Sequence, residues 1–205
     1  MRARARSVVL LAGASGSGKT RLARLAGCPR LALDDFYRDG EEPGLPPALG
    51  IVDWDDPASW DADAALATMI TLGRDGAADV PGYDLSTSRR TGWHRLDLGD
   101  HRGFVAEGIF APEMVRRARA AGLDVTAIWL DRPRTATLIM RLARDLIEHR
   151  KPPVVLLRRG AALWRTEPVV RARAVSAGCR PMVLRTAVTV VRALTSPPNP
   201  PFCAQ

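Results

Sequence analysis

A chain of 205 residues is long enough for one α/β domain with a small lid and too short for two full domains. Its apolar content of 46% and charged content of 25% are typical of a globular protein and exclude general disorder. The net charge of +8 is nearly all arginine spread through every segment, so it does not indicate nucleic acid as the main partner. We therefore expect a single folded domain over residues 1–195.

The three cysteines, Cys28, Cys179 and Cys203, lack the spacing of a zinc or disulfide framework, which favours a reducing compartment. No stretch of about 18 uncharged apolar residues occurs, so no membrane span is expected. The N-terminal arginines and the apolar run at 7–12 resemble a short signal peptide, but the run continues into a glycine-rich motif that cleavage would destroy. We therefore expect a cytoplasmic protein.

Short apolar runs alternate with segments of helical periodicity along the first three quarters of the chain. In chain order they predict a strand at 7–11, a helix at 20–26, a strand at 30–33, a loop at 40–50, a helix at 61–72 capped by Asp61, turns at 80–92, a strand at 103–106, a helix at 113–121, a strand at 125–130 and a helix at 134–149. This order is typical of an α/β fold whose parallel sheet is covered by helices on both faces.

The last quarter of the chain gives a weaker pattern. Pro152 and Pro153 end the helix at 134–149. The chain is then mostly helical up to Leu194, with one strand near Met182. Residues 196–205 carry four prolines and are expected to form a disordered tail.

The glycine-rich motif matches the phosphate-loop pattern GxxxxGK[ST] in full, and it lies between a predicted strand and a predicted helix, as its mechanism requires. Its glycines let backbone N–H groups turn inward around phosphates, and the helix N-terminus adds the positive end of its dipole. Lys19 is expected to bridge the β- and γ-phosphates, and the Thr20 hydroxyl to coordinate Mg²⁺. The sequence therefore predicts a site for ATP or GTP at Gly13, Ala14, Ser15, Gly16, Ser17, Gly18, Lys19 and Thr20.

Acidic residues follow two of the predicted strands. Asp34 and Asp35 follow the strand at 30–33, and Glu107 follows the strand at 103–106. Because the carboxyl ends of parallel strands gather at one edge, these side chains are expected beside the phosphate loop. One carboxylate there could accept the proton of an attacking hydroxyl, and another could hold Mg²⁺. Two ordinary roles stay open: a helix cap for either aspartate, and a surface charge for Glu107.

The phosphate loop is shared by GTPases, motor ATPases and kinases, so it does not choose among them. The wider set of motifs, however, resembles the uridine kinase family, in the group that includes phosphoribulokinase. The motifs stand in that family's order: GASGSGKT at 13–20, LDDFY at 33–37, DWDDPASWD at 53–61, PGYD at 81–84, SRR at 88–90, VAEGIFA at 105–111 and RLARD at 141–145. The resemblance implies a P-loop kinase fold with a helical lid at about 134–153, and an enzyme that uses ATP and Mg²⁺ to phosphorylate a ribose 5′-hydroxyl.

The resemblance also implies a role for individual residues. Asp34 is expected to be the catalytic base, with Lys19 and the lid arginines Arg141 and Arg144 neutralising charge in the transition state. Glu107 matches a Mg²⁺-associated carboxylate. The expected substrate-binding residues are Tyr37, Trp54, Asp55, Tyr83 and Arg89. A homo-oligomer that binds a small-molecule acceptor is implied as well.

Two departures from the family pattern leave the acceptor open. After Asp84 the family usually places a histidine that reads the pyrimidine base, whereas this chain continues with Leu-Ser-Thr-Ser at 85–88. In the lid, His149 and Lys151 stand where arginines are common. A kinase of another small alcohol, such as pantothenate or a sugar, is therefore a second interpretation. A regulatory or nucleic-acid-associated NTPase is a third, suggested only by the basic charge.

Four more residues carry simple expectations. His94 and His101 lie in a polar, turn-rich stretch and are expected at the surface. Trp60 and Trp129 are expected in the core, because large aromatic side chains are usually buried.

Overall fold

The structure, a computed structural model, describes residues 6–48, 51–133 and 167–198, together with Thr135, Thr137 and Met140. Apart from those three residues, the predicted lid with Arg141 and Arg144 lies outside the described residues, and so do residues 199–205 of the predicted tail. Within the described ranges, none of the helices combines the length and the apolar character that a membrane span needs.

The fold is built on a parallel sheet of five strands in the order β2-β7-β1-β8-β9. The strands are β1 (Ser7–Ala12), β2 (Arg30–Ala32), β7 (Gly103–Glu107), β8 (Val125–Leu130) and β9 (Arg180–Met182). The first four of these strands in chain order were predicted within one or two residues, and β9 includes Met182, near which a strand was expected. The second strand ends one residue early, because Leu33 begins the 3₁₀ helix η1 (Leu33–Phe36).

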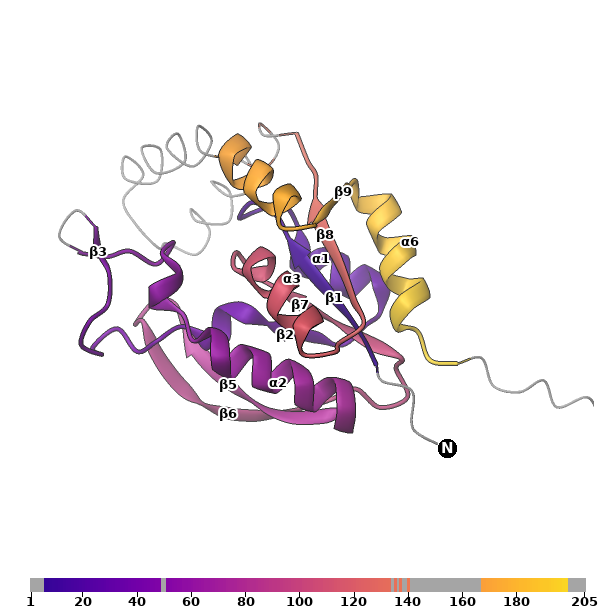
Figure 1. Cartoon of the computed structure of the whole chain (residues 1–205), viewed down its shortest axis with the longest axis horizontal. Coiled ribbons are helices and arrows are strands. Elements are labelled where there is room, and N and C mark those ends of the chain that lie inside the picture. Colours follow the sequence, from indigo (N-terminus) through magenta and orange to yellow (C-terminus); the bar gives the residue numbers. More distant parts are fainter. Residues whose placement is uncertain are drawn as a thin grey trace, which may run out of the picture.

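Helices cover both faces of this sheet, as the strand–helix alternation predicts. On one face, Val9 and Leu11 pack with α1 (Lys19–Ala26) and α6 (Leu184–Thr195). On the other face, Val8 and Leu10 pack with α2 (Ala62–Asp75) and α3 (Ala111–Ala120). Successive residues of β1 thus feed two separate apolar cores, which requires a strand that is apolar throughout. Figure 1 shows α6 and α2 on opposite sides of the sheet.

The helices predicted at 20–26, 61–72 and 113–121 and the predicted core tryptophans agree with the structure. The carboxylate of Asp61 accepts a hydrogen bond of 2.9 Å from the Ala64 N–H, so it caps α2 as predicted. Trp60 and Trp129 are both buried. Residues 167–176 are helical and precede β9.

The turns predicted over 80–92 are found only at 85–88, and the rest of that stretch is strand. The chain there forms an antiparallel hairpin of β5 (Ala77–Asp84) and β6 (Arg89–Asp97), with a bulge between Gly82 and Tyr83. Almost every residue of β6 is exposed, so the strand carries no alternation of apolar and polar residues that a sequence pattern could reveal. Cross-strand pairing, which is not visible in a local pattern, forms the hairpin. It lies beside α2 (Figure 1).

The region around the predicted loop at 40–50 is mostly irregular. It contains a short antiparallel ladder of β3 (Pro47–Ala48) and β4 (Ile51–Val52), and a 3₁₀ turn, η2 (Pro57–Ser59), follows. The Gly40 N–H donates to the Ser88 carbonyl, so this loop is attached to the tip of the hairpin.

The strand order places a topological switch point at the middle of the sheet. From β1 the chain passes through α1 to β2 on one side, whereas from β7 it passes through α3 to β8 on the other side. The carboxyl ends of the adjacent strands β1 and β7 therefore open onto one crevice, with Leu11 paired to Glu107. Ligands of open parallel sheets bind at such a point.

Candidate active site

The phosphate loop follows β1 directly and ends at the start of α1, which begins at Lys19. Gly16 and Gly18 have φ angles of 84° and 96°, a left-handed conformation that side chains with a Cβ rarely adopt. At Gly13 a Cβ would lie 2.8 Å from the Ser17 hydroxyl oxygen. The glycines of the motif are thus required by the backbone path itself.

Lys19 lies across the loop rather than in solvent. Its side-chain ammonium donates a hydrogen bond of 3.0 Å to the Gly13 carbonyl, and the residue is only 9% exposed. Ser17, inside the same turn, is buried. A cation and a hydroxyl held in a turn of glycines are suited to an anion with several oxygens, such as a polyphosphate.

Glu107, at the end of β7, connects this strand to the phosphate loop. Its Oε1 accepts hydrogen bonds from the Thr20 hydroxyl at 2.8 Å and from the Arg30 guanidinium at 2.9 Å. Glu107 is 6% exposed. Within the described residues, no group of three or more His, Cys, Asp or Glu side chains is arranged to hold a metal. The hydroxyl of Thr20 beside a carboxylate is a pair of hard oxygen ligands, the kind that suits Mg²⁺.

Asp34 is the second residue of η1, and its carboxylate lies among the charges of the loop. Burial raises the pKa of this carboxyl most strongly, and the charge of Glu107 raises it further, while the Lys19 ammonium lowers it. Its Oδ1 lies so near Gly108 that a Cβ on that glycine would be 2.8 Å from it. Gly108 therefore provides the space into which the aspartate points.

Two buried side-chain oxygens in the described part of the chain lack a hydrogen-bond partner, namely Ser17 Oγ and Asp34 Oδ1. Both belong to the crevice between β1 and β7. Buried polar atoms are nearly always satisfied, so unpaired ones that share one crevice indicate a place where a ligand supplies the missing partners.

Asp35, next along η1, is influenced by other charged residues of the site. Burial raises its pKa, whereas the positive charges of Arg30 and His94 lower it. His94 is exposed in β6, as expected. His101 is half-buried, and its ring nitrogens contact the carbonyls of Leu98 and Gly27.

Aromatic residues form a cluster next to the carboxylates. Tyr37 is its centre, with ring centroids 5.4 Å from Trp54, 5.6 Å from Tyr83 and 5.9 Å from Phe110. Tyr37 itself is buried, and its hydroxyl donates to the Trp54 carbonyl. Trp54 and Tyr83 are only partly buried, so these two rings remain accessible to a planar ligand. Burial raises the pKa of Tyr83 to about 12, so its hydroxyl stays protonated.

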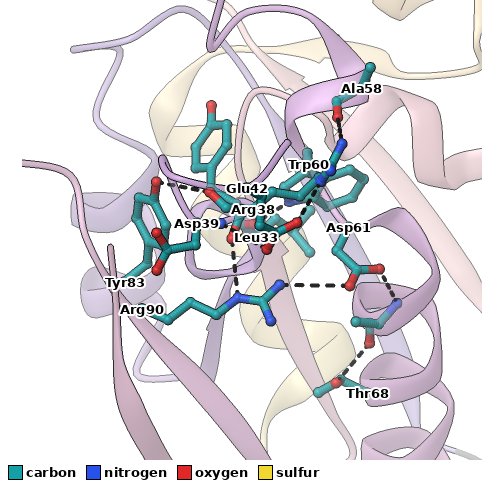
Figure 2. A network of polar contacts seen from close by, with 12 residues as sticks. Leu33, Arg38, Asp39, Glu42, Ala58, Trp60, Asp61, Thr68, Tyr83 and Arg90 are labelled. Carbon is teal, nitrogen blue, oxygen red and sulfur yellow. Dashed lines mark hydrogen bonds and ion pairs between the residues drawn. The ribbon is translucent and has the colours of Figure 1, made fainter. Parts of the chain in front are cut away.

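A polar network fixes the segment that carries Asp34, as Figure 2 shows. The Trp60 indole N–H donates to the Leu33 carbonyl at 2.6 Å. Arg90, from the hairpin, reaches the carbonyl of Tyr37 and lies 3.7 Å from the Asp61 carboxylate. The hairpin is thus tied to both ends of the segment that follows β2.

A second set of contacts within the same network holds the loop after η1. Arg38 donates to Glu42 at 2.9 Å and to the Ala58 carbonyl at 3.2 Å. The Tyr83 hydroxyl donates to the Arg38 carbonyl at 3.2 Å, which brings the hairpin and the loop together (Figure 2).

The structure does not bring every predicted substrate residue to the carboxylates. Asp55 is exposed, and its N–H donates to the Asp53 side chain. Arg89 forms an ion pair with Glu41 in the loop after η1. These positions lie on segments next to the aromatic cluster, and their roles remain predictions.

Sequence reasoning missed three residues that build the site: Arg30, Arg90 and Gly108. Gly108 follows Glu107 in the motif VAEGIFA at 105–111, so that motif contained a signal that could have identified it. Arg90 depends on the hairpin, which was not predicted. Arg30 depends on the pairing of β2 with β7.

Comparison with protein-family models gives no match. Among curated proteins, the chain is 28% identical to a uridine kinase of Ureaplasma urealyticum over 159 residues, 74% of each chain. It is 29% identical to a uridine kinase of Staphylococcus aureus over 152 residues, 71% of each chain. Among solved structures, it is similar to a candidate fructose transport system kinase from Silicibacter sp. TM1040, with a TM-score of 0.61 and 20% identity, over 83% of this chain and 87% of that one.

The resemblance predicted from the motifs is therefore confirmed by curated uridine kinases over about seven tenths of the chain. The solved structure confirms the predicted fold, a P-loop kinase fold with a parallel sheet flanked by helices.

Proposed function

We propose that this protein with a P-loop kinase fold is a phosphotransferase that moves the γ-phosphoryl group of ATP to the hydroxyl of a small acceptor, most favourably the 5′-hydroxyl of a nucleoside. The observation that carries the proposal is the position of Asp34. Its carboxylate is buried beside the Lys19 charge, and one of its oxygens lacks a partner. A carboxylate so placed is available to the proton of an attacking hydroxyl.

Each residue of the crevice would then have a separate role in an in-line transfer of the phosphoryl group. Asp34 orients the acceptor hydroxyl through its free Oδ1 and takes its proton as the bond to phosphorus forms. Lys19 and the N–H groups of the loop balance the charge of the phosphates. Arg141 and Arg144 are proposed to add positive charge from the lid. Thr20 and Glu107 would hold Mg²⁺, which supplies further charge neutralisation at the phosphate oxygens.

The aromatic cluster supports a nucleoside as the acceptor. Trp54 and Tyr83 present partly exposed rings close to the segment that carries Asp34, and a base has a flat face that stacks on such rings. The similarity to uridine kinases supports the same class. Asp55 is proposed to bind the ribose hydroxyls, and Arg89 is proposed to bind the acceptor at the rim of the pocket. We further propose that the enzyme acts in the cytoplasm and as a homo-oligomer.

A second candidate is a kinase of another small alcohol, such as a sugar or pantothenate. The observation that favours it is the hairpin tip, Leu85 to Ser88, which offers hydroxyls where related kinases place a base-reading histidine. The chemistry at Asp34 would be unchanged, and only the contacts of the acceptor would differ.

A panel of acceptors tests the proposal. Purified protein with ATP and Mg²⁺ is assayed for coupled ADP release against uridine, cytidine, adenosine, fructose, glucose and pantothenate, and the best acceptor is assayed again with GTP. We expect release to rise by at least about 10²-fold over the rate without acceptor for one nucleoside, because water alone is poorly positioned as a nucleophile. A response confined to a sugar or pantothenate selects the second candidate. Equal ADP release with and without every acceptor would contradict both.

A further inference from the structure

Arg30 is a charged residue of the crevice to which no motif assigns a role. It begins β2, an edge strand of the sheet, and its guanidinium donates to Glu107 Oε1 at 2.9 Å. Its side chain is 39% exposed, whereas that of Glu107 is 8% exposed. An arginine rooted at the open edge therefore extends inward to a carboxylate that is almost fully buried.

The strand register explains how this contact arises. Ala32 of β2 pairs with Glu107 of β7, and Arg30 pairs with Val105. Residues two apart in a strand share a face, so Arg30 and Glu107 both project toward the face that α1 covers. The long arginine side chain spans the difference of two residues along the strand. The contact is thus fixed by backbone pairing and not by a flexible loop.

The two carboxylate oxygens of Glu107 differ in their hydrogen-bond partners. Thr20 and Arg30 both donate to Oε1, and in the described part of the chain no donor contacts Oε2. Two donors on one oxygen fix the plane of the carboxylate, because rotation would break both hydrogen bonds. The second oxygen is then left for a ligand beside the Thr20 hydroxyl.

Arg30 also balances negative charge in the crevice. Three carboxylates meet at this edge, Asp34, Asp35 and Glu107, and each of the aspartates is influenced by Glu107. Lys19 acts on Asp34, while Arg30 acts on Asp35 and binds Glu107. Without Arg30, Glu107 would lose its ion pair and Asp35 would lose the stronger of the two positive charges that act on it, whereas the phosphates require Lys19.

We propose that Arg30 is a positioning residue: it holds the carboxylate of Glu107 in the orientation that presents Oε2, together with the Thr20 hydroxyl, to the Mg²⁺ of a bound nucleotide. The inference rests on the proposed function only in requiring that Mg²⁺ and a nucleoside triphosphate bind this crevice. It does not depend on the identity of the acceptor.

The test measures Mg²⁺ dependence of nucleotide binding rather than turnover. Binding of a non-hydrolysable ATP analogue is followed by calorimetry across a Mg²⁺ series and in EDTA, for the full chain and for Arg30→Met. We expect the Mg²⁺ concentration for half-maximal enhancement to rise about 10- to 100-fold, the usual cost of losing a partner of a metal ligand. Affinity in EDTA should change less than about 3-fold, since Arg30 does not touch the phosphate loop.

Two further variants keep the result unambiguous. Arg30→Lys retains the charge but not the planar guanidinium, so it should recover part of the Mg²⁺ affinity. If Arg30→Met does not fold, Arg30→Lys is compared with the unmodified protein in its place. Arg180→Met removes an exposed arginine from the start of β9, the opposite edge strand, and should match the unmodified protein.

Either of two results would overturn the inference. Arg30→Met could leave the Mg²⁺ requirement equal to that of Arg180→Met, which would make the contact incidental. It could also lower the requirement, which would show that the guanidinium competes with the metal for Glu107. If the unmodified protein binds the analogue with no Mg²⁺ dependence at all, the proposed function fails, and the inference fails with it.

Discussion

Replacing Lys19 with alanine is expected to abolish measurable turnover, a loss of at least about 10³-fold in kcat/KM. The ammonium lies within the loop, 3.0 Å from the Gly13 carbonyl, where it would face the phosphates. Its removal takes away the cation that acts on the buried carboxylate of Asp34 and that would face the phosphates. Steady-state assays with the best acceptor of the panel measure the loss.

A matched control separates this effect from a general loss of positive charge. Arg24 lies in the last turn of the same helix α1 and is exposed. Arg24→Ala should keep kcat/KM within about 2-fold, because an exposed charge away from the crevice contributes little to it. If both variants lose activity equally, or neither does, the phosphate loop does not act as described.

Asp34→Asn is expected to lower kcat by about 10²- to 10⁴-fold while leaving the affinity for nucleotide nearly unchanged. The amide keeps the shape of the carboxylate beside Gly108 but cannot accept a proton. Binding of a nucleotide analogue, measured alongside kcat, distinguishes loss of a base from loss of a site. Normal turnover in this variant would show that another group activates the acceptor.

The raised pKa of Asp34 predicts a pH dependence of kcat/KM that tests whether Asp34 is the base. Because burial raises this pKa, the ionised base is lost at a higher pH than for an ordinary aspartate, so kcat/KM should fall on the acid side earlier than pKa values near 4 would allow. Ionisation of a buried carboxyl also destabilises the folded state above its raised pKa, and this cost disappears as the pH falls through that pKa. Asp34→Asn should therefore melt no lower than the unmodified protein at pH 8, although it is inactive.

The centre of the sheet was predictable because the strands there are mostly apolar runs next to a local signal. Val8 to Leu11 precede the glycine motif, and Gly103 to Ala106 precede an acidic residue. The hairpin was not predictable in the same way. β6 is exposed along almost its whole length, and its many polar residues give it no apolar alternation. Its stability comes from pairing with β5, which a local pattern does not contain.

The residues of the candidate site also differ in whether a local pattern could predict them. Lys19, Thr20 and Glu107 stand in motifs, and the structure brings Thr20 and Glu107 into contact at 2.8 Å. Arg30 carries no motif, and it enters the site only because β2 pairs with β7 in one particular register. Tyr37 was predicted to line the acceptor pocket, yet it is buried as the centre of the aromatic cluster, leaving Trp54 and Tyr83 as the accessible rings.

The fate of the γ-phosphate tests the central claim most directly. ATP labelled with ³²P at the γ position is incubated with the protein, Mg²⁺ and the best acceptor, and the products are separated. A carboxylate that aims an alcohol at the terminal phosphorus predicts label on the acceptor, in an amount equal to the ADP formed, with almost none as free phosphate. Label released as free phosphate, at a rate that the acceptor does not change, would contradict the account.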